Sequence, residues 1–137
     1  MSASWQDPAV IDRLLDETST WAVVGLSNDT SRTASEIADL LRGKGKRVIP
    51  IHPSAPTVAG EQGYATLAEV PHQVDVVDLF VRSELAGPVV DQAIAVGAKG
   101  VWLQLGVIDE QAAQRAAAAG LDVVMDTCPA IEWRGRD

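Results

Sequence analysis

The feature that most constrains the fold is a regular alternation of short apolar runs with segments of helical periodicity. The apolar runs do not alternate strictly between apolar and polar residues, which indicates strands covered on both faces. Strands of that kind belong to parallel sheets with a helix in each crossover connection. The predicted strands are Trp21–Leu26, Arg47–Ile51, Val74–Val81, Lys99–Leu103 and Asp122–Met125.

Helical spacing fills most of the intervals between these strands. The first helix begins at Asp7-Pro8, because Asp caps a helix and Pro suits its first position. Glycines mark several helix ends. In the segment before Val89, Gly87 and Pro88 disturb the first turn, so the start of that helix is open. The predicted helices are 8–18, 34–41, 89–96 and 109–119, with one helical turn at 67–70.

This order of elements predicts an α/β fold. Right-handed crossovers arrange such a chain as a Rossmann-like three-layer sandwich, a five-stranded parallel sheet with helices on both faces. The length of 137 residues fits one domain, which we expect to span residues 1–137.

Composition excludes several classes of function. Lys and Arg number 11 against 19 Asp and Glu, a net charge of −8, which argues against a nucleic-acid partner. The single cysteine, Cys128, rules out an intramolecular disulfide and a Cys-based zinc cluster. No apolar run approaches the roughly 18 residues of a membrane span, and the first residues do not resemble a signal peptide. We therefore expect no membrane partner and a cytoplasmic location.

The loop from Gly25 to Ser35 is a candidate phosphate site, because ligands of open α/β sheets bind beyond the carboxyl ends of the strands. Gly25 permits a tight turn, and several hydroxyl side chains follow it. The amides at the start of the next helix attract anions, and Arg32 adds a fully ionised donor. A plain polar loop with a solvated Arg32 is the alternative, which we consider slightly less favoured.

Two further observations bear on the ligand. The dinucleotide pattern G-x-G-x-x-G is absent, since Ser27 and Thr30 follow Gly25 where glycines are expected, and the Walker-A pattern is absent too. The second strand ends at His52-Pro53 without the acidic residue that usually binds the ribose of NAD. One interpretation is that His52 contacts a ribose or a 3′-phosphate. The equally favoured alternative is that His52 is an exposed loop residue without a ligand.

Five segments occur together in a familiar order. Their sequences are Val23-Val-Gly-Leu-Ser27 with Arg32, Val48-Ile-Pro-Ile-His-Pro53, Val74-Asp-Val-Val-Asp-Leu-Phe-Val-Arg82, Val101-Trp-Leu-Gln-Leu-Gly106 and Val124-Met-Asp-Thr-Cys128. Over roughly residues 8 to 134 the chain resembles the small stand-alone CoA-binding proteins, whose domain is similar to the CoA-binding domain of the succinyl-CoA synthetase alpha subunit.

The resemblance implies that coenzyme A lies over the carboxyl edge of the sheet. The residues that would take the phosphates are Gly25, Leu26, Ser27, Arg32 and Ser35. The adenosine would lie between His52 and Pro53 on one side and Phe80, Val81 and Arg82 on the other. The pantetheine arm would approach Gln104 and Gly106. Thr127 departs from the basic residue expected there in many relatives.

No catalytic residue and no metal ligand is predicted. Asp75, Asp78 and Asp126 form a conceivable acid pair or metal site, but a structural role is favoured: Asp75 opens a strand and Asp78 satisfies adjacent backbone donors. The nucleophile elbow G-x-S-x-G fails, because the residue two after Ser27 is Asp29. The predicted function is therefore binding of coenzyme A or an acyl-CoA without catalytic machinery of the chain's own.

Two alternative functions stay open. One is a regulatory protein that binds NAD or another nucleotide, and the other is an enzyme acting on acyl-CoA through Asp78, Asp126 or Cys128. Cys128 follows the fifth strand, so its thiol should lie near the ligand edge. Packing is its favoured role, and a mixed disulfide with the CoA thiol is the alternative.

A homodimer or a protein partner also stays open. Trp102 lies in an apolar strand and is expected in the core. Trp5, Trp21 and Trp133 lie near the chain ends or the base of the domain, where a shared exposed surface would suit a dimer contact.

Overall fold

The structure is a computed structural model that describes residues 5–136. Within these residues it contains a parallel five-stranded sheet in the order β2-β1-β3-β4-β5. The strands are β1 (Thr20–Val24), β2 (Arg47–Ile51), β3 (Val76–Leu79), β4 (Gly100–Leu103) and β5 (Asp122–Met125). Almost every strand residue is buried, as expected for a sheet covered on both faces. The predicted α/β Rossmann-like fold is confirmed.

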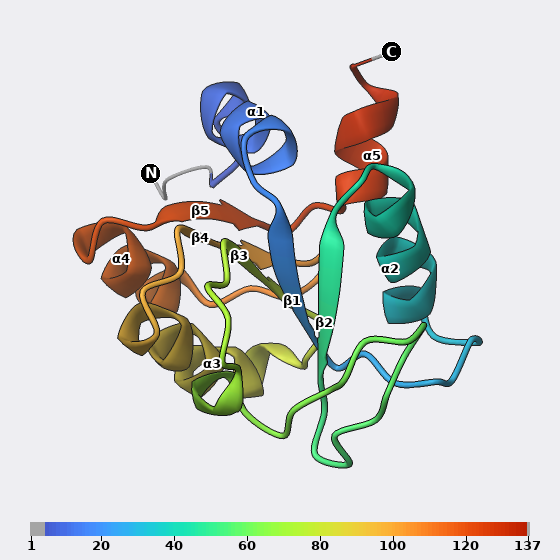
Figure 1. Cartoon of the computed structure of the whole chain (residues 1–137). Helices are drawn as coiled ribbons and strands as arrows, with labels where there is room; N and C mark the ends of the chain where they lie inside the picture. The colour runs from blue at the N-terminus through green and yellow to red at the C-terminus, as the bar shows by residue number, and fades with distance from the viewer. Residues whose placement is uncertain (1–4, 137) are drawn as a thin grey trace.

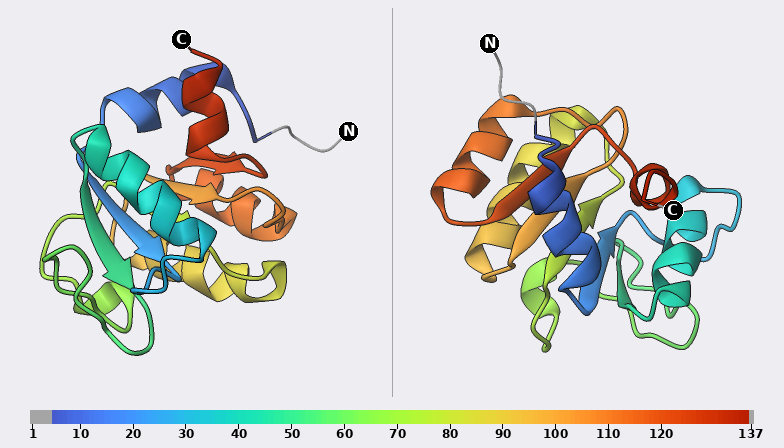
Figure 2. Two further views of the ribbon diagram at one scale, coloured as in Figure 1. Left: turned by 90° about the vertical axis from the view of Figure 1, so that its right-hand side faces the viewer. Right: turned by 90° about the horizontal axis from the view of Figure 1, so that it is seen from above.

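Helices form the two outer layers (Figure 1). On one face lie α1 (Pro8–Asp16), α2 (Thr33–Gly43) and α5 (Pro129–Arg134), whose apolar side chains share one core cluster with that face of the sheet. On the other lie α3 (Ser83–Ala95), α4 (Glu110–Ala118) and the short 3-10 helix η1 (Leu67–Glu69), which share the second cluster. The views of Figure 2 show the sheet between the two layers.

Three elements differ from the sequence-based expectation. The third strand is limited to β3 and is shorter at both ends than the expected 74–81. The Asp75 N–H donates to the Thr20 carbonyl at 2.9 Å just before the strand, and Phe80 and Val81 lie beyond its end. Helix α3 begins at Ser83, six residues before Val89, and contains Pro88. Proline removes one backbone donor near the start of a helix, but burial of Ala86 and Val90 on the sheet still favours the helix there. Helix α5 was not predicted, since six residues are too few to show a helical period.

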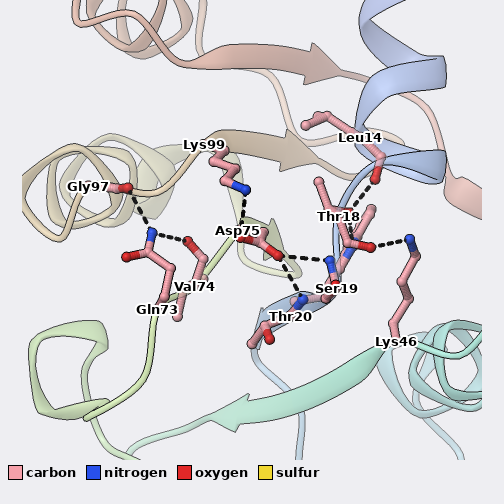
Figure 3. Close-up of polar contacts among 11 residues, drawn as sticks. Leu14, Thr18, Ser19, Thr20, Lys46, Gln73, Val74, Asp75, Gly97 and Lys99 are labelled. Carbon is pink, nitrogen blue, oxygen red and sulfur yellow. Dashed lines mark hydrogen bonds and ion pairs between the residues drawn. The ribbon is translucent and has the colours of Figure 1, made fainter.

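The amino edge of the sheet carries a polar network that closes the base of the fold (Figure 3). Asp75 accepts the N–H groups of Ser19 at 2.8 Å and Thr20 at 3.0 Å, and Lys99 Nζ lies 3.4 Å from its other oxygen. Burial by itself would raise the pKa of Asp75. The hydrogen bonds from Ser19 and Thr20 and the charge of Lys99 together outweigh burial, so the net effect is a lowered pKa. Asp75, directly before β3, thus has the structural role that the sequence favoured.

The tryptophans lie mainly inside. Trp21 and Trp102 are fully buried with ring centroids 5.8 Å apart, and Trp102 Nε1 donates to the Thr127 carbonyl at 2.9 Å. Trp102 is in the core, as predicted. Trp133 is also buried, so Trp21 and Trp133 do not provide the exposed surface on which the dimer contact considered from the sequence depends. Within residues 5–136, no helix is long and apolar enough to cross a membrane.

Candidate functional site

The chain reverses its direction of winding between β1 and β3. From β1 it passes to β2 at one edge, and from β3 onward it continues on the other side of β1. Such a switch point opens a crevice at the carboxyl ends of the two central strands. Gly25 directly follows β1 there, and Phe80 directly follows β3; the Phe80 N–H donates to the Val24 carbonyl at 2.9 Å.

Gly25 is the residue that makes this crossing possible. Its φ of +101° lies in the region that favours glycine, and a Cβ added to it would lie 2.5 Å from the Phe80 carbonyl oxygen. Both the turn and the close approach therefore require a residue without a side chain. The backbone at Gly25 is left open to a ligand.

Two cavities adjoin this crossing. The first, about 510 Å³, lies toward α2, and we name it the α2-side cavity. The second, about 480 Å³, lies between the end of β2 and α3, and we name it the α3-side cavity. The residues common to both are Gly25, Arg32, Phe80 and Val81. Because they share these residues, the two cavities lie next to each other at the carboxyl edge of the sheet.

Two arginines bring positive charge to the cavities: Arg32 lines both, and Arg82 lines the α2-side cavity. Arg32 is the N-cap residue of α2, and within the described chain no side chain accepts the first amides of that helix. Arg32 is 75% exposed with its Nε 3.5 Å from Asp29, and Arg82 is 78% exposed with its Nε 4.0 Å from Glu84. Exposed pairs at these distances hold a guanidinium only weakly, so both cations are available to an anionic ligand.

The α3-side cavity takes residues from the end of β2. His52 and Pro53 line it. His52 Nδ1 accepts the Ser54 N–H at 3.2 Å and lies 2.9 Å from the Ser54 hydroxyl, which leaves Nε2 available to a ligand. The α3 residues on the opposite wall are Leu85, Val89 and Gln92.

The α2-side cavity has a different floor. Gln104 lines it and is 4% exposed. The Gln104 Nε2 donates to Asp78 Oδ1 at 2.5 Å, and Asp78 is completely buried in the centre of β3. Desolvation raises the pKa of Asp78 to about 8, so the carboxyl is protonated at neutral pH. The expectation that Asp78 satisfies backbone donors is wrong, because its partner is a side chain.

Cys128 lies at the same cavity. It lines the α2-side cavity and is half-buried, which places its thiol at the ligand edge as predicted. Burial raises the pKa of this thiol. A protonated thiol is a poor nucleophile, so the geometry brings Cys128 to the site without activating it.

All but three of the site residues predicted from the sequence line one cavity or both. Leu26 is 1% exposed and belongs to the core. Ser35 lies in the first turn of α2, outside the lining. Gly106 lies beside the α2-side cavity, where its N–H donates to Asp126 Oδ1 at 2.8 Å.

Sequence reasoning missed the walls contributed by α3 and by the loop after β2. Leu85, Val89 and Gln92 are spaced as one face of a helix, a signal hidden when the helix is expected to begin at Val89. Ala65 and Thr66 reach the cavity because the loop folds back along β2, where the Tyr64 N–H donates to the Pro50 carbonyl at 3.0 Å. In residues 5–136, no three His, Cys, Asp or Glu residues gather as a metal site.

The chain is similar to several known proteins. It is 31% identical over 120 residues to the uncharacterized protein YneT of Bacillus subtilis, covering 88% of this chain and 89% of that protein. A hypothetical protein from Pyrococcus horikoshii OT3 superposes with a TM-score of 0.90 at 31% identity, covering 98% of this chain and 95% of the other.

A larger enzyme contains the same fold. The apo form of the dinucleotide-forming acetyl-coenzyme A synthetase 1 of Ca. Korarchaeum cryptofilum superposes with a TM-score of 0.72 at 26% identity, covering 89% of this chain and 30% of the synthetase. Residues 19–134, almost the whole chain, match the family described as the CoA binding domain. The chain therefore belongs to the CoA binding domain family.

Proposed function

We propose that this chain binds coenzyme A, free or as an acyl-CoA, across the carboxyl edge of its sheet at the crossing of β1 and β3. Membership of the CoA binding domain family supports the ligand. The observation that carries the location is the pair of adjoining cavities that share Gly25 and Phe80 in their lining. A ligand with a nucleotide at one end and a long arm at the other fits a site with two lobes.

The chemistry of each lobe assigns the parts of the ligand. The diphosphate lies over Gly25, where Arg32 and the first amides of α2 supply positive charge. The adenosine occupies the α3-side cavity beside His52 and Pro53. The pantetheine arm occupies the α2-side cavity, whose lining is mostly apolar with the amide of Gln104 at its floor.

Coenzyme A suits this site better than NAD does. The turn after β1 lacks the remaining glycines of the dinucleotide pattern, and the residue that follows β2 is His52 rather than an acid. A histidine with Arg32 in the lining of the same cavity favours a phosphorylated ribose over a free one. Calorimetric titrations with CoA, NAD and ATP compare the three ligands directly. CoA should bind most tightly, and tight binding of NAD without any heat or competition from CoA would refute the proposal.

A matched pair of arginine variants tests the location. Arg32→Ala removes the cation at the crossing, whereas Arg42→Ala removes an arginine at the far end of α2. Both arginines pair with an aspartate three residues earlier, and both variants change the net charge equally. A lost charge-assisted hydrogen bond of about 1.5–3 kcal/mol weakens binding about tenfold or more. Arg32→Ala should show this loss and Arg42→Ala should not; equal effects would contradict the location.

We further propose that the chain binds its ligand without converting it. Two observations support this role: the carboxyl of Asp78 is completely buried, and burial keeps the Cys128 thiol protonated. Acetyl-CoA incubated with the protein should stay intact, with no release of free thiol above the rate without protein. Catalytic release of CoA that Cys128→Ser or Asp78→Asn abolishes would instead show an enzyme acting on acyl-CoA.

A further inference from the structure

Asp78 lies among apolar side chains, and nothing in this packing requires a carboxyl group. The register pairs it with Val23 of β1 and Trp102 of β4, and that face of the sheet packs into an apolar cluster. Within residues 5–136, Asp78 Oδ2 is the only fully buried side-chain oxygen or nitrogen without a hydrogen-bond partner. Burial of such an atom opposes folding. An unsatisfied group of this kind calls for a role outside stability.

The contact that Asp78 does make leads to the cavity. Its Oδ1 accepts the Gln104 Nε2 at 2.5 Å, which fixes the amide of Gln104. The other amide atom, Gln104 Oε1, has no hydrogen bond to the described residues. It does not belong to the fully buried atoms without a partner, so part of its surface is accessible. Because Gln104 lines the α2-side cavity, Oε1 is the atom that it offers to that cavity.

We propose that Asp78 is a positioning residue, which holds Gln104 so that its Oε1 accepts a hydrogen bond from an amide N–H of the pantetheine arm of CoA. This inference rests on the proposed function. Pantetheine contains two secondary amides, and each N–H needs an acceptor when it leaves water. Among the described residues that line this cavity, Gln104 supplies the only side-chain carbonyl.

The neutral state of Asp78 suits this role. A carboxylate beneath the cavity would add negative charge to a site that must bind an anionic ligand. A protonated carboxyl still offers the carbonyl oxygen that Gln104 requires, so the amide is oriented without that charge. Cys128 is a titratable side chain close enough to Asp78 to feel its charge, and burial raises the pKa of the Cys128 thiol, so this neighbour is also uncharged.

The prediction concerns discrimination between ligands with and without the arm. Adenosine 3′,5′-bisphosphate carries the nucleotide of CoA but no pantetheine. Calorimetry with both ligands is carried out on the wild type, Asp78→Leu, Asp78→Asn and Gln104→Leu. Asp78→Leu removes the acceptor for Gln104 and should weaken CoA about three- to tenfold, the range of one hydrogen bond. The affinity for the bisphosphate should be unchanged.

The other variants separate positioning from a merely structural effect. Asp78→Asn keeps the carbonyl and the shape of the side chain, so it should retain the affinity of the wild type for CoA. Gln104→Leu removes Oε1 itself and tests the role without altering β3, even where Asp78→Leu fails to fold. The double variant should lose no more than Gln104→Leu alone, since both changes remove the same hydrogen bond.

The outcomes also separate this inference from the proposed function. Unchanged CoA affinity in Asp78→Leu, or equal losses for CoA and the bisphosphate, would overturn the positioning role. Unchanged CoA affinity in Gln104→Leu would overturn it as well. A wild-type protein that binds neither ligand would refute the proposed function itself.

Discussion

Replacing Asp78 by asparagine should change how folding stability depends on pH. Burial raises the pKa of the Asp78 carboxyl from 3.8 to about 8. Between these values the folded chain keeps the proton while the unfolded chain loses it, so folding takes up a proton. The free energy of unfolding must then fall as the pH rises from about 4 to about 8, after which the loss is complete.

The size of the effect follows from the shift in pKa. Each unit corresponds to about 1.4 kcal/mol, so the full loss is on the order of 6 kcal/mol. That is a large share of the roughly 5–15 kcal/mol that stabilises a typical domain. Asparagine does not ionise and escapes this loss, so Asp78→Asn should be the more stable protein at pH 8. Near pH 4 the unfolded chain has lost this proton only in part, so the loss of stability is still small and the two proteins should differ little.

Urea unfolding at pH 5, 6, 7 and 8, followed by the fluorescence of the buried Trp21 and Trp102, measures this dependence. Asp75→Asn is a matched control, because the pKa of Asp75 is lowered and its contribution to stability is lost only as the pH falls below about 4. Asp75→Asn should lower stability by a similar amount at every pH of the series. Parallel profiles for the wild type and Asp78→Asn would refute the assignment of a neutral, buried carboxyl.

Three further predictions address the crossing and the cavities. Arg82→Ala should weaken CoA binding less than Arg32→Ala, because Arg82 lines one cavity and Arg32 both; calorimetry checks this, and a larger loss in Arg82→Ala would reverse the ranking. Gly25→Ala should destabilise the fold by about 2 kcal/mol or more. The control is Gly120→Ala, which should cost less because Gly120 also has a positive φ but a Cβ there would meet no atom within 4 Å. Equal urea midpoints for the two variants would contradict this. Cys128 should form no CoA disulfide under mild oxidation at pH 7; intact mass checks this, and a reversible gain of one CoA, absent in Cys128→Ser, would contradict it.

The strands and their order of appearance were predictable because burial on both faces leaves a local signature, as in Trp21–Val24. The carboxyl edge was predictable as the ligand edge because every parallel α/β sheet exposes its strand-to-helix turns there. Side-chain direction was not predictable in the same way. The sequence shows Asp78 within an apolar run but not that Gln104, from the neighbouring strand, is its partner.

The long loop after β2 and the start of α3 were also hidden from local patterns. Tyr64 returns to β2 through a contact that no short window contains. Gly87 lowers helix propensity, yet it lets α3 approach α4 closely: a Cβ there would lie 3.3 Å from Asp109 Oδ2. Tertiary packing outweighs intrinsic propensity at both places.

A crystal structure of the protein with bound coenzyme A tests the central claim most directly. We expect the diphosphate over Gly25 at the start of α2, within hydrogen-bond distance of Arg32. The adenosine should lie beside His52, and the pantetheine arm should reach Gln104. Coenzyme A bound anywhere other than the carboxyl ends of β1 and β3, for example at the amino edge near Asp75, would contradict the proposed site.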